Sequence, residues 1–289
     1  METIAMASEP QTAQEPCPRS LYVGLASSQG QVRRRNEDSV LAWHFTFLAE
    51  GQLPWPIGLF VLADGMGGHR HGAEASALVT RVAAGYVIRQ VCLPILSAEE
   101  SGDRPPIHQV LETGVHLAHD AVLRRLPEAG ATLTMALLLG DSVYLAHVGD
   151  SRAYLGQRGS LRPLTKDHSV AARLVEMGQA TAEEVDAQRH ILYKAVGQGK
   201  TVQPDVTYHS FKKGQYLLLC CDGLWSTVSE AEMATIIEEA SSPHCACQEL
   251  VNRANELGSD DNISVIVVAW EWPLPEEPAS VDAEQNHGI

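Results

Sequence analysis

The chain has 289 residues, 45% of them hydrophobic, and a formal net charge of −15. A chain of this length buries roughly three quarters of the surface that its unfolded form exposes, so we expect a globular protein with a large core. The acidic balance argues against binding a nucleic-acid backbone through a basic patch, because that mode of binding needs clustered Lys and Arg.

The composition favours a soluble protein of the cytoplasm. No apolar stretch approaches the roughly 20 residues that a membrane span requires, and the first residues are polar and acidic. The six cysteines are scattered along a chain too long to need disulfide bonds, so we expect reduced thiols. His244, Cys245 and Cys247 lack a second pair at zinc-finger spacing, and they predict the start of a helix rather than a zinc site. We expect a cytoplasmic monomer that binds neither a membrane nor nucleic acid.

The first half of the chain predicts three strands followed by two helices. Residues 1–20 lack hydrophobic periodicity and carry Pro, Gln and Glu, which predicts disorder. The runs "LYVGLAS", "SVLAWHF" and "GLFVLAD" have the length, β-branching and turn boundaries of strands. The third predicted strand ends on Asp64. Apolar residues then recur at helical spacing over residues 71–91, and a second helix is expected over Ile107–Leu126.

The second half predicts mainly strands. Over residues 131–165, short apolar runs alternate with Gly-Asp and Gly-Ser turns, which is typical of an antiparallel meander. The polar segment 166–198 indicates a partly helical excursion from the core. A strand over 215–222, helices around 231–240 and 245–257, and a last strand over 263–270 follow, and residues 273–289 are again expected to be disordered. These blocks predict an α+β fold with a large antiparallel component.

Acidic residues recur where predicted strands begin or end: Glu37, Asp38, Asp64, Asp150, Asp222 and Asp261. Any one of them is most simply a turn or cap residue, but the same reading is weaker for the whole set. If these strand ends converge, the carboxylates repel one another unless cations neutralise them. Carboxylate, carbonyl and water ligands select hard ions such as Mg²⁺ or Mn²⁺ over zinc. Gly65 lacks a β-carbon, so its backbone can closely approach such an ion.

Five short motifs occur in order: "VRRRNEDS", "VLADGMGG", "HVGDSRAYL", "CCDGLWS" and "SDDNISVIV". The series resembles the metal-dependent serine/threonine protein phosphatases of the PPM, or type 2C, family in its bacterial form. Each motif alone is weakly specific, whereas the ordered series from Val32 to Val267 is very specific. The resemblance implies a four-layer αββα sandwich, two antiparallel sheets flanked by helices, in one domain over residues 21–272. It also implies that residues 166–198 form a mobile flap.

The resemblance further implies a centre of two Mn²⁺ or Mg²⁺ ions at one edge of the sandwich. Asp64 would bridge the ions, Glu37 or Asp38 and the Gly65 carbonyl would complete one side, and Asp222 and Asp261 would hold the other ion. Asp150 matches a position that, with Asp222, binds a third and weaker metal. Arg33 matches the phosphate-binding arginine and Asn262 a residue beside the phosphate. Arg34 and Arg35 are read as solvated surface charges.

The expected chemistry is hydrolysis by a hydroxide. Two close divalent ions lower the pKa of a shared water, which then attacks phosphorus in line, while Arg33 offers a forked donor to two phosphate oxygens. The leaving alkoxide needs a proton, but Met66 stands where many eukaryotic relatives have a histidine. His69, His190 and metal-bound water remain as alternatives, and either histidine is equally well read as an ordinary surface residue.

The predicted function is therefore metal-dependent hydrolysis of phosphoserine and phosphothreonine in phosphorylated proteins, in signal transduction. The alternative is a catalytically inactive regulatory module that binds metal and phosphopeptide; loss of metal carboxylates would favour it, and the sequence retains all of them. A third reading takes "GMGGHRHG" as a phosphate-cradling loop for nucleotides, but that run lacks the Gly-Lys-Ser/Thr ending of a P-loop.

Overall fold

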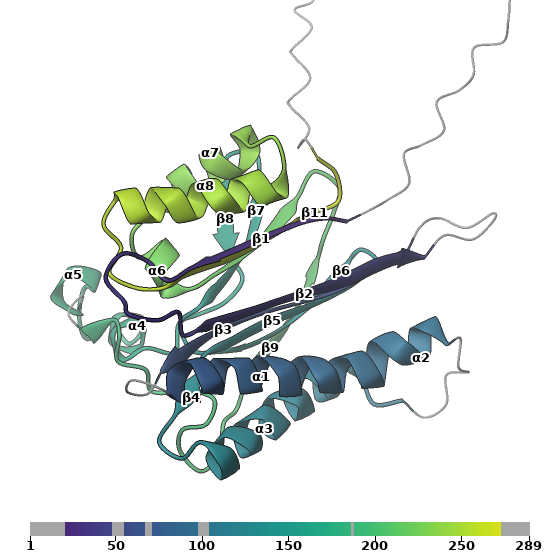
Figure 1. Ribbon diagram of the computed structural model, residues 1–289, viewed down its shortest axis with the longest axis horizontal. Coiled ribbons are helices and arrows are strands. Elements are labelled where there is room, and N and C mark those ends of the chain that lie inside the picture. Colours follow the sequence, from purple (N-terminus) through teal and green to yellow (C-terminus); the bar gives the residue numbers. More distant parts are fainter. Residues whose placement is uncertain (1–20, 48–54, 67–70, 98–103, 186–187, 273–289) are drawn as a thin grey trace, which may run out of the picture.

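Two β-sheets lie face to face, with helices on both outer faces, in the computed structural model of the chain (Figure 1). The structure describes residues 21–47, 55–66, 71–97, 104–185 and 188–272. The predicted α+β class and αββα layering are confirmed. The expected disorder of residues 1–20 and 273–289 lies outside the described residues.

Every strand pair in the two sheets is antiparallel. The first sheet has the order β1 (Tyr22–Ser28), β11 (Ile263–Ala269), β10 (Tyr216–Cys220), β7 (Arg152–Gln157) and β8 (Ser160–Pro163). The second has the order β2 (Asp38–Phe47), β3 (Trp55–Met66), β5 (Leu133–Leu139), β6 (Ser142–Val148) and β9 (Asp205–Ser210). A two-residue strand, β4 (Gly130–Ala131), pairs with the end of β3.

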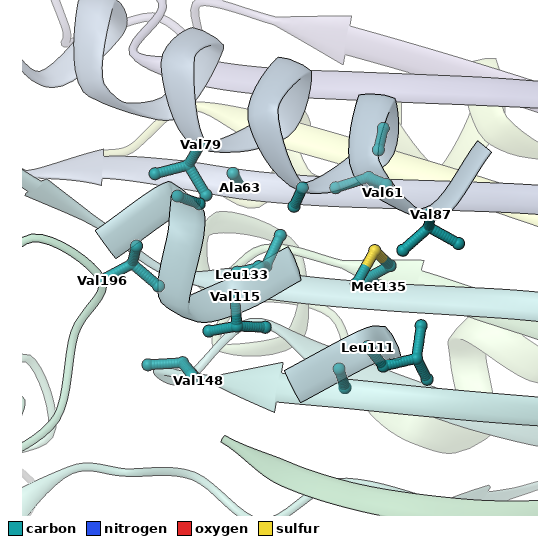
Figure 2. Close-up of a cluster of buried hydrophobic side chains, with 14 of the residues drawn as sticks. Val61, Ala63, Val79, Val87, Leu111, Val115, Leu133, Met135, Val148 and Val196 are labelled. Carbon is teal, nitrogen blue, oxygen red and sulfur yellow. The ribbon is translucent and has the colours of Figure 1, made fainter. Parts of the chain in front are cut away.

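The central strands are buried on both faces, which explains their nearly continuous apolar sequences. In β3, Leu59 and Val61 point toward the helices, whereas Phe60 and Leu62 belong to the apolar layer between the sheets. Successive side chains of a strand point to opposite faces, so both layers need apolar residues. Figure 2 shows the first of these layers, with side chains of β3 and β5 facing those of the covering helices.

Helices cover the outer face of each sheet. The long α1 (His71–Val87) continues through a π-helical turn (Ile88–Cys92) into α2 (Leu93–Leu96), and with α3 (Ile107–Arg125) it covers the second sheet. The first sheet is covered by α7 (Glu230–Glu239) and α8 (Pro243–Glu256). Three short helices, α4 (Val170–Glu176), α5 (Ala182–Val185) and α6 (Asp222–Trp225), lie in connecting segments.

One helical stretch corrects the expectation that no segment is apolar enough to span a membrane. By length and composition alone, the 26 residues His71–Leu96 pass that test. The apolar composition has a use within the fold, since α1 packs on β3 and α3 and buries Val79, Ala83 and Val87 in the core.

Two strands differ from the sequence-based expectation. Strand β3 continues past Asp64 to Met66, because Gly65 and Met66 pair with β4. Asp64 therefore lies inside a strand rather than at its end. Strand β9 was not predicted: it is a mostly exposed edge strand with few apolar residues, and its pairing with β6 defines it.

Candidate active site

A cavity of about 1000 Å³ brings together residues from widely separated parts of the sequence. Its lining includes nine residues of the predicted site: Arg33, Glu37, Asp64, Gly65, Asp150, His190, Asp222, Asp261 and Asn262. Asp38 lies beside it as the strand partner of Asp64. The remaining residue of the predicted site, His69, falls outside the described residues.

Asp38 and Asp64 occupy facing positions of β2 and β3. Both continue the row of side chains that points between the sheets, as Val40 and Leu62 do. Both residues keep some exposed surface, but the two carboxylate oxygens of Asp38 are inaccessible and make no hydrogen bond of acceptable geometry. Burial raises the pKa of Asp38 to about 7, with a partial offset from nearby Ser264 and Cys221.

Burial and the neighbouring carboxylates raise the pKa of Asp64 well above its usual range. The carboxylates that act on it are those of Asp38, Asp222, Asp150 and Asp261, in decreasing order. The predicted ligands are therefore close enough to one another in the fold to interact electrostatically, although up to 223 positions of sequence separate them, from Asp38 to Asp261.

Three further aspartates reach the cavity from turns and a helix start. Asp150 lies in the turn between β6 and β7, Asp222 is the first residue of α6, and Asp261 precedes β11. Burial, followed by repulsion from Asp222, raises the pKa of Asp150 to about 8 and also raises that of Asp261. Oδ1 of Asp222 is buried without a hydrogen-bond partner.

This group of oxygens suits hard divalent cations. Buried carboxylate oxygens without donors, as in Asp38 and Asp222, are costly unless a cation or a proton compensates them. At Gly65 only glycine fits the backbone packing, since a β-carbon there would lie 2.2 Å from the Gly72 carbonyl oxygen and 2.7 Å from that of Glu37. Within the described ranges, no group of three or more acidic, His or Cys side chains already has the geometry of a metal site. The donors fit Mg²⁺ or Mn²⁺ in type, because those ions prefer oxygen ligands.

Arg33 lies at the rim, bound to a predicted metal ligand. Its Nη2 donates to Oδ2 of Asp261 at 2.5 Å, and its Nε donates to the Asp260 carbonyl at 3.3 Å. Its side chain is about half exposed, at 51%. The guanidinium thus sits where the acidic floor of the cavity meets solvent.

Asn262 lines the cavity and binds the backbone of three other residues. Its Oδ1 accepts from the Glu37 amide at 2.8 Å, and its Nδ2 donates to the carbonyls of Gln29 and Arg35, both at 2.8 Å. Both amide hydrogens are thereby used, and none remains for a phosphate. The Asn262 side chain therefore holds the loop that carries Arg33, and its predicted place beside the phosphate stays a prediction.

His190 enters the cavity from the segment 166–198. Its Nδ1 lies 3.8 Å from Oδ2 of Asp222, which is an ion-pair distance rather than a hydrogen bond, while its Nε2 accepts from Nε of Arg189 at 3.2 Å. The tautomer that suits both contacts carries its proton on Nδ1. Contact with Asp222 raises the pKa of His190, although partial burial works against this.

Sequence reasoning missed the residues that hold the Asp150 turn. Nδ1 of His168 accepts from the Gly149 amide at 3.0 Å, and the His168 amide donates to the Gly149 carbonyl at 2.7 Å. On the other side, Nε1 of Trp225 donates to the Asp150 carbonyl at 2.9 Å. Trp225 stands inside the motif "CCDGLWS", whereas His168 lies 13 residues after the motif "HVGDSRAYL", and only the fold shows that both meet at the Asp150 turn.

The comparisons with known proteins agree on one family. The Protein phosphatase 2C family profile matches residues 99–263. The serine/threonine phosphatase stp of Listeria welshimeri is 32% identical over 250 residues, covering 86% of this chain and 95% of that protein. The structure of the Streptococcus agalactiae serine/threonine phosphatase covers 87% of this chain and 100% of its own, with a TM-score of 0.72 and 29% identity.

A second solved structure bears on the metal. The catalytic domain of the serine/threonine phosphatase PstP, in complex with two manganese ions, is 30% identical, has a TM-score of 0.67 and covers 86% of this chain and 99% of its own. With the family match, the shared fold and the acidic cavity, these findings show that the chain belongs to the Protein phosphatase 2C (PPM) family of serine/threonine phosphatases.

Proposed function

We propose that the chain hydrolyses phosphoserine and phosphothreonine in proteins through a divalent-metal site in the acidic cavity. The observation that carries the proposal is the convergence of Asp64, Asp150, Asp222 and Asp261 on one cavity with Asp38 beside it, where oxygens of Asp38 and Asp222 are buried without donors. The proposed setting is the cytoplasm, where the chain would act as a monomer on signalling phosphoproteins.

Two ions would share Asp64, with Glu37 or Asp38 and the Gly65 carbonyl holding one of them and Asp222 and Asp261 holding the other. Asp150 and Asp222 would hold a third, weaker ion. When bound, such ions supply a hydroxide nucleophile near neutral pH and offset charge that develops on the phosphoryl oxygens. The two manganese ions of the PstP catalytic domain support this reading, because that domain has the same fold.

The chain's own side chains would bind the phosphate and supply a proton. The Nη1 group of Arg33 makes no hydrogen bond to the described residues, and Arg33 lines the same cavity, so this group is available to donate to a phosphate oxygen. His190 is the donor proposed for the leaving alkoxide: contact with Asp222 raises its pKa, and Nε2 would gain the transferable proton when it gives up the hydrogen bond from Arg189.

No observation favours the inactive binding module. A phosphatase fold that has lost catalysis would be expected to lack some of the acidic residues, whereas every predicted carboxylate is present and described. The nucleotide-binding reading fares no better, since Gly65 and Met66 belong to β3 and pair with β4 instead of opening a phosphate-cradling loop.

The test is phosphate release from a phosphothreonine peptide by the purified chain with Mn²⁺, with Mg²⁺ and with EDTA. Release that requires metal is expected. Isothermal titration with Mn²⁺ on the same sample provides the second readout. A folded protein that binds Mn²⁺ and the peptide, yet releases no phosphate, would replace the proposal with the inactive module.

A further inference from the structure

Two arginines at the mouth of the cavity are unused by the mechanism above. Arg34 and Arg35 were read from the sequence as solvated surface charges, but both line the same cavity as Asp64 and Asp222. Both are exposed. They therefore stand beside the place where the scissile phosphate would bind, rather than on an unrelated surface.

Neither guanidinium has a protein partner within the described part of the chain. Arg33 is paired with Asp261, whereas no hydrogen bond or ion pair to a described residue is made by the side chain of Arg34 or Arg35. Free arginines are notable here, because the chain has 36 acidic and 21 basic residues and the cavity itself is lined by acids. Charges that merely balanced that acidic floor would be expected to pair with it, as Arg33 does.

The loop that carries the two arginines is held in place. The Arg35 carbonyl accepts from Nδ2 of Asn262, and the Arg33 carbonyl accepts from Nε2 of Gln29 at 2.7 Å. The Glu37 amide donates to Oδ1 of Asn262. A fixed backbone keeps the two charges at the mouth, so a ligand that binds them loses less freedom than it would on a mobile loop.

The acidic lining does not cancel this attraction. Glu37, Asp64, Asp150, Asp222 and Asp261 are the residues proposed to hold metal ions, whose charge would offset theirs. Asp260 also lines the cavity, but its charge acts on His190, and its carbonyl accepts from Arg33. With metal bound, Arg34 and Arg35 would leave the mouth positive beside the phosphate position.

We propose that Arg34 and Arg35 form a subsite for a second anionic group of the substrate, next to the phosphoryl group that is removed. The inference rests on the proposed function and adds a substrate class to it: phosphopeptides that carry another phosphate or a carboxylate close to the target residue. Arginine suits both groups, because its planar fork donates two parallel hydrogen bonds to a phosphate or a carboxylate. The cavity, at about 1000 Å³, has room for residues beyond the phosphorylated side chain.

The experiment compares phosphothreonine peptides whose neighbouring residues, on either side, are serine, aspartate or phosphoserine. For each peptide, kcat/KM is measured at low and at high salt, and mass spectrometry identifies which phosphate leaves. The aspartate and phosphoserine peptides separate the two sources of the anionic group. Binding of the same fluorescent peptides to the Mn²⁺-loaded chain is measured by anisotropy, which reports the preference without turnover.

The variant is the double substitution R34Q/R35Q. Its matched control is R124Q/R125Q, which also removes two adjacent exposed charges, but from the end of α3 and outside the cavity lining. We expect the original chain to prefer a peptide with an anionic neighbour over the serine peptide by about tenfold, mainly through KM. The preference should shrink at high salt and fall to about twofold or less in R34Q/R35Q, while the control keeps it.

Equal kcat/KM and equal binding for the serine, aspartate and phosphoserine peptides would overturn the subsite, as would an undiminished preference in R34Q/R35Q. These outcomes differ from failure of the proposed function, in which no peptide releases phosphate with any metal. In that case the anisotropy measurement still decides whether the two arginines select anionic peptides.

Discussion

Asp38 and Asp64 face each other across β2 and β3, in the strand register that also pairs Val40 with Leu62. Two rows of apolar side chains thus end in two opposed carboxylates between the sheets. Neither oxygen of Asp38 has a hydrogen-bond donor, and repulsion from Asp38 helps to raise the pKa of Asp64. Without a cation, the carboxyl groups of Asp38 and Asp64 keep protons in the folded state that they release in the unfolded chain.

The metal-free protein should therefore lose stability as pH rises. Burial raises the pKa of Asp38 to about 7 and that of Asp150 to about 8, against about 3.9 in an unfolded chain. Between these values the folded state binds more protons than the unfolded state, so the free energy of unfolding falls with pH. In EDTA, we expect Tm to drop by about 5 °C or more from pH 5 to pH 8, measured by differential scanning fluorimetry.

Asp38→Asn should flatten that pH dependence, because it removes one of the titrating groups. The matched control is Asp120→Asn, which removes an exposed carboxylate of α3 that is not part of the cavity lining. Added Mn²⁺ should also flatten the curve, since cations displace the protons. A Tm that is constant or rises from pH 5 to pH 8 in EDTA would contradict the argument.

Asp64→Asn and Asp222→Asn should each abolish metal-dependent hydrolysis. A carboxamide keeps the shape of the side chain but not the charge that holds a divalent ion, so we expect a loss of at least about 100-fold in kcat/KM. Titration calorimetry should show weaker Mn²⁺ binding in both variants, with Asp120→Asn again as the control. Full activity of both variants with purified metal would remove these two residues from the proposed site.

Asn262→Ala tests whether this side chain acts by holding the loop that carries Arg33. The substitution removes three partly buried hydrogen bonds, to the backbone of Gln29, Arg35 and Glu37. We expect a loss of about 1–3 kcal/mol in the free energy of unfolding and an increase of several-fold in KM for a phosphopeptide, because Arg33 shares the loop. Urea unfolding and steady-state kinetics measure the two effects.

The control for that variant is Asn255→Ala, which removes one side-chain hydrogen bond, to the Val251 carbonyl, on α8. It should leave KM unchanged. A direct phosphate contact by Asn262 predicts a different result, namely a large rise in KM with little change in stability.

Apolar periodicity predicted the elements that contribute most to the core. Strands β10 and β11 and helix α3 lie within a few residues of their expected positions, because burial on one or both faces leaves a clear sequence pattern. Strand β9 carries no such pattern, since exposed residues occupy most of it and pairing with β6 defines it. The prediction that β3 ends at Asp64 was wrong for a similar reason: β4, some 65 residues later, pairs with the strand and extends it beyond Asp64.

In the candidate site, too, one part could be predicted from the sequence and another part could not. The repeated placement of acids beside strand ends, together with the motif series, predicted which carboxylates the fold brings together. The contacts that position them were beyond reach, since Asn262 holds residues 225 or more positions away and His168 holds a glycine 19 positions away. Hydrogen bonds of this kind depend on the tertiary fold and leave no local pattern in composition or periodicity.

His168 should act as a positioning residue for the Asp150 turn. It exchanges two hydrogen bonds with Gly149, and its Nε2 lies 3.1 Å from Nζ of Lys194 and 3.2 Å from Oδ2 of Asp205. His168→Ala leaves the buried Gly149 amide without an acceptor, which should loosen the turn. We expect Mn²⁺ affinity to fall several-fold and amide exchange around Gly149 to accelerate.

His168→Asn is the conservative comparison, because the carboxamide oxygen can replace Nδ1 as the acceptor for Gly149 while the contacts to Lys194 and Asp205 are lost. It should recover most of the Mn²⁺ affinity and of the exchange protection. If the alanine and asparagine variants behave alike, the contacts of Nε2, rather than the hold on Gly149, determine the position of the turn.

His190→Gln tests the proposed proton donor through the leaving group. Threonine leaves as an alkoxide that needs a proton, whereas nitrophenolate from p-nitrophenyl phosphate leaves without one. We expect kcat for a phosphothreonine peptide to fall at least about tenfold and kcat for p-nitrophenyl phosphate to fall much less. Because the protonated imidazole is the active form and Asp222 raises its pKa, the alkaline decline in peptide turnover should also disappear in the variant.

His116→Gln, on the exposed face of α3, is the control. Equal losses for the two substrates would mean that His190 only shapes the cavity, and the proton would then come from His69 or from a metal-bound water.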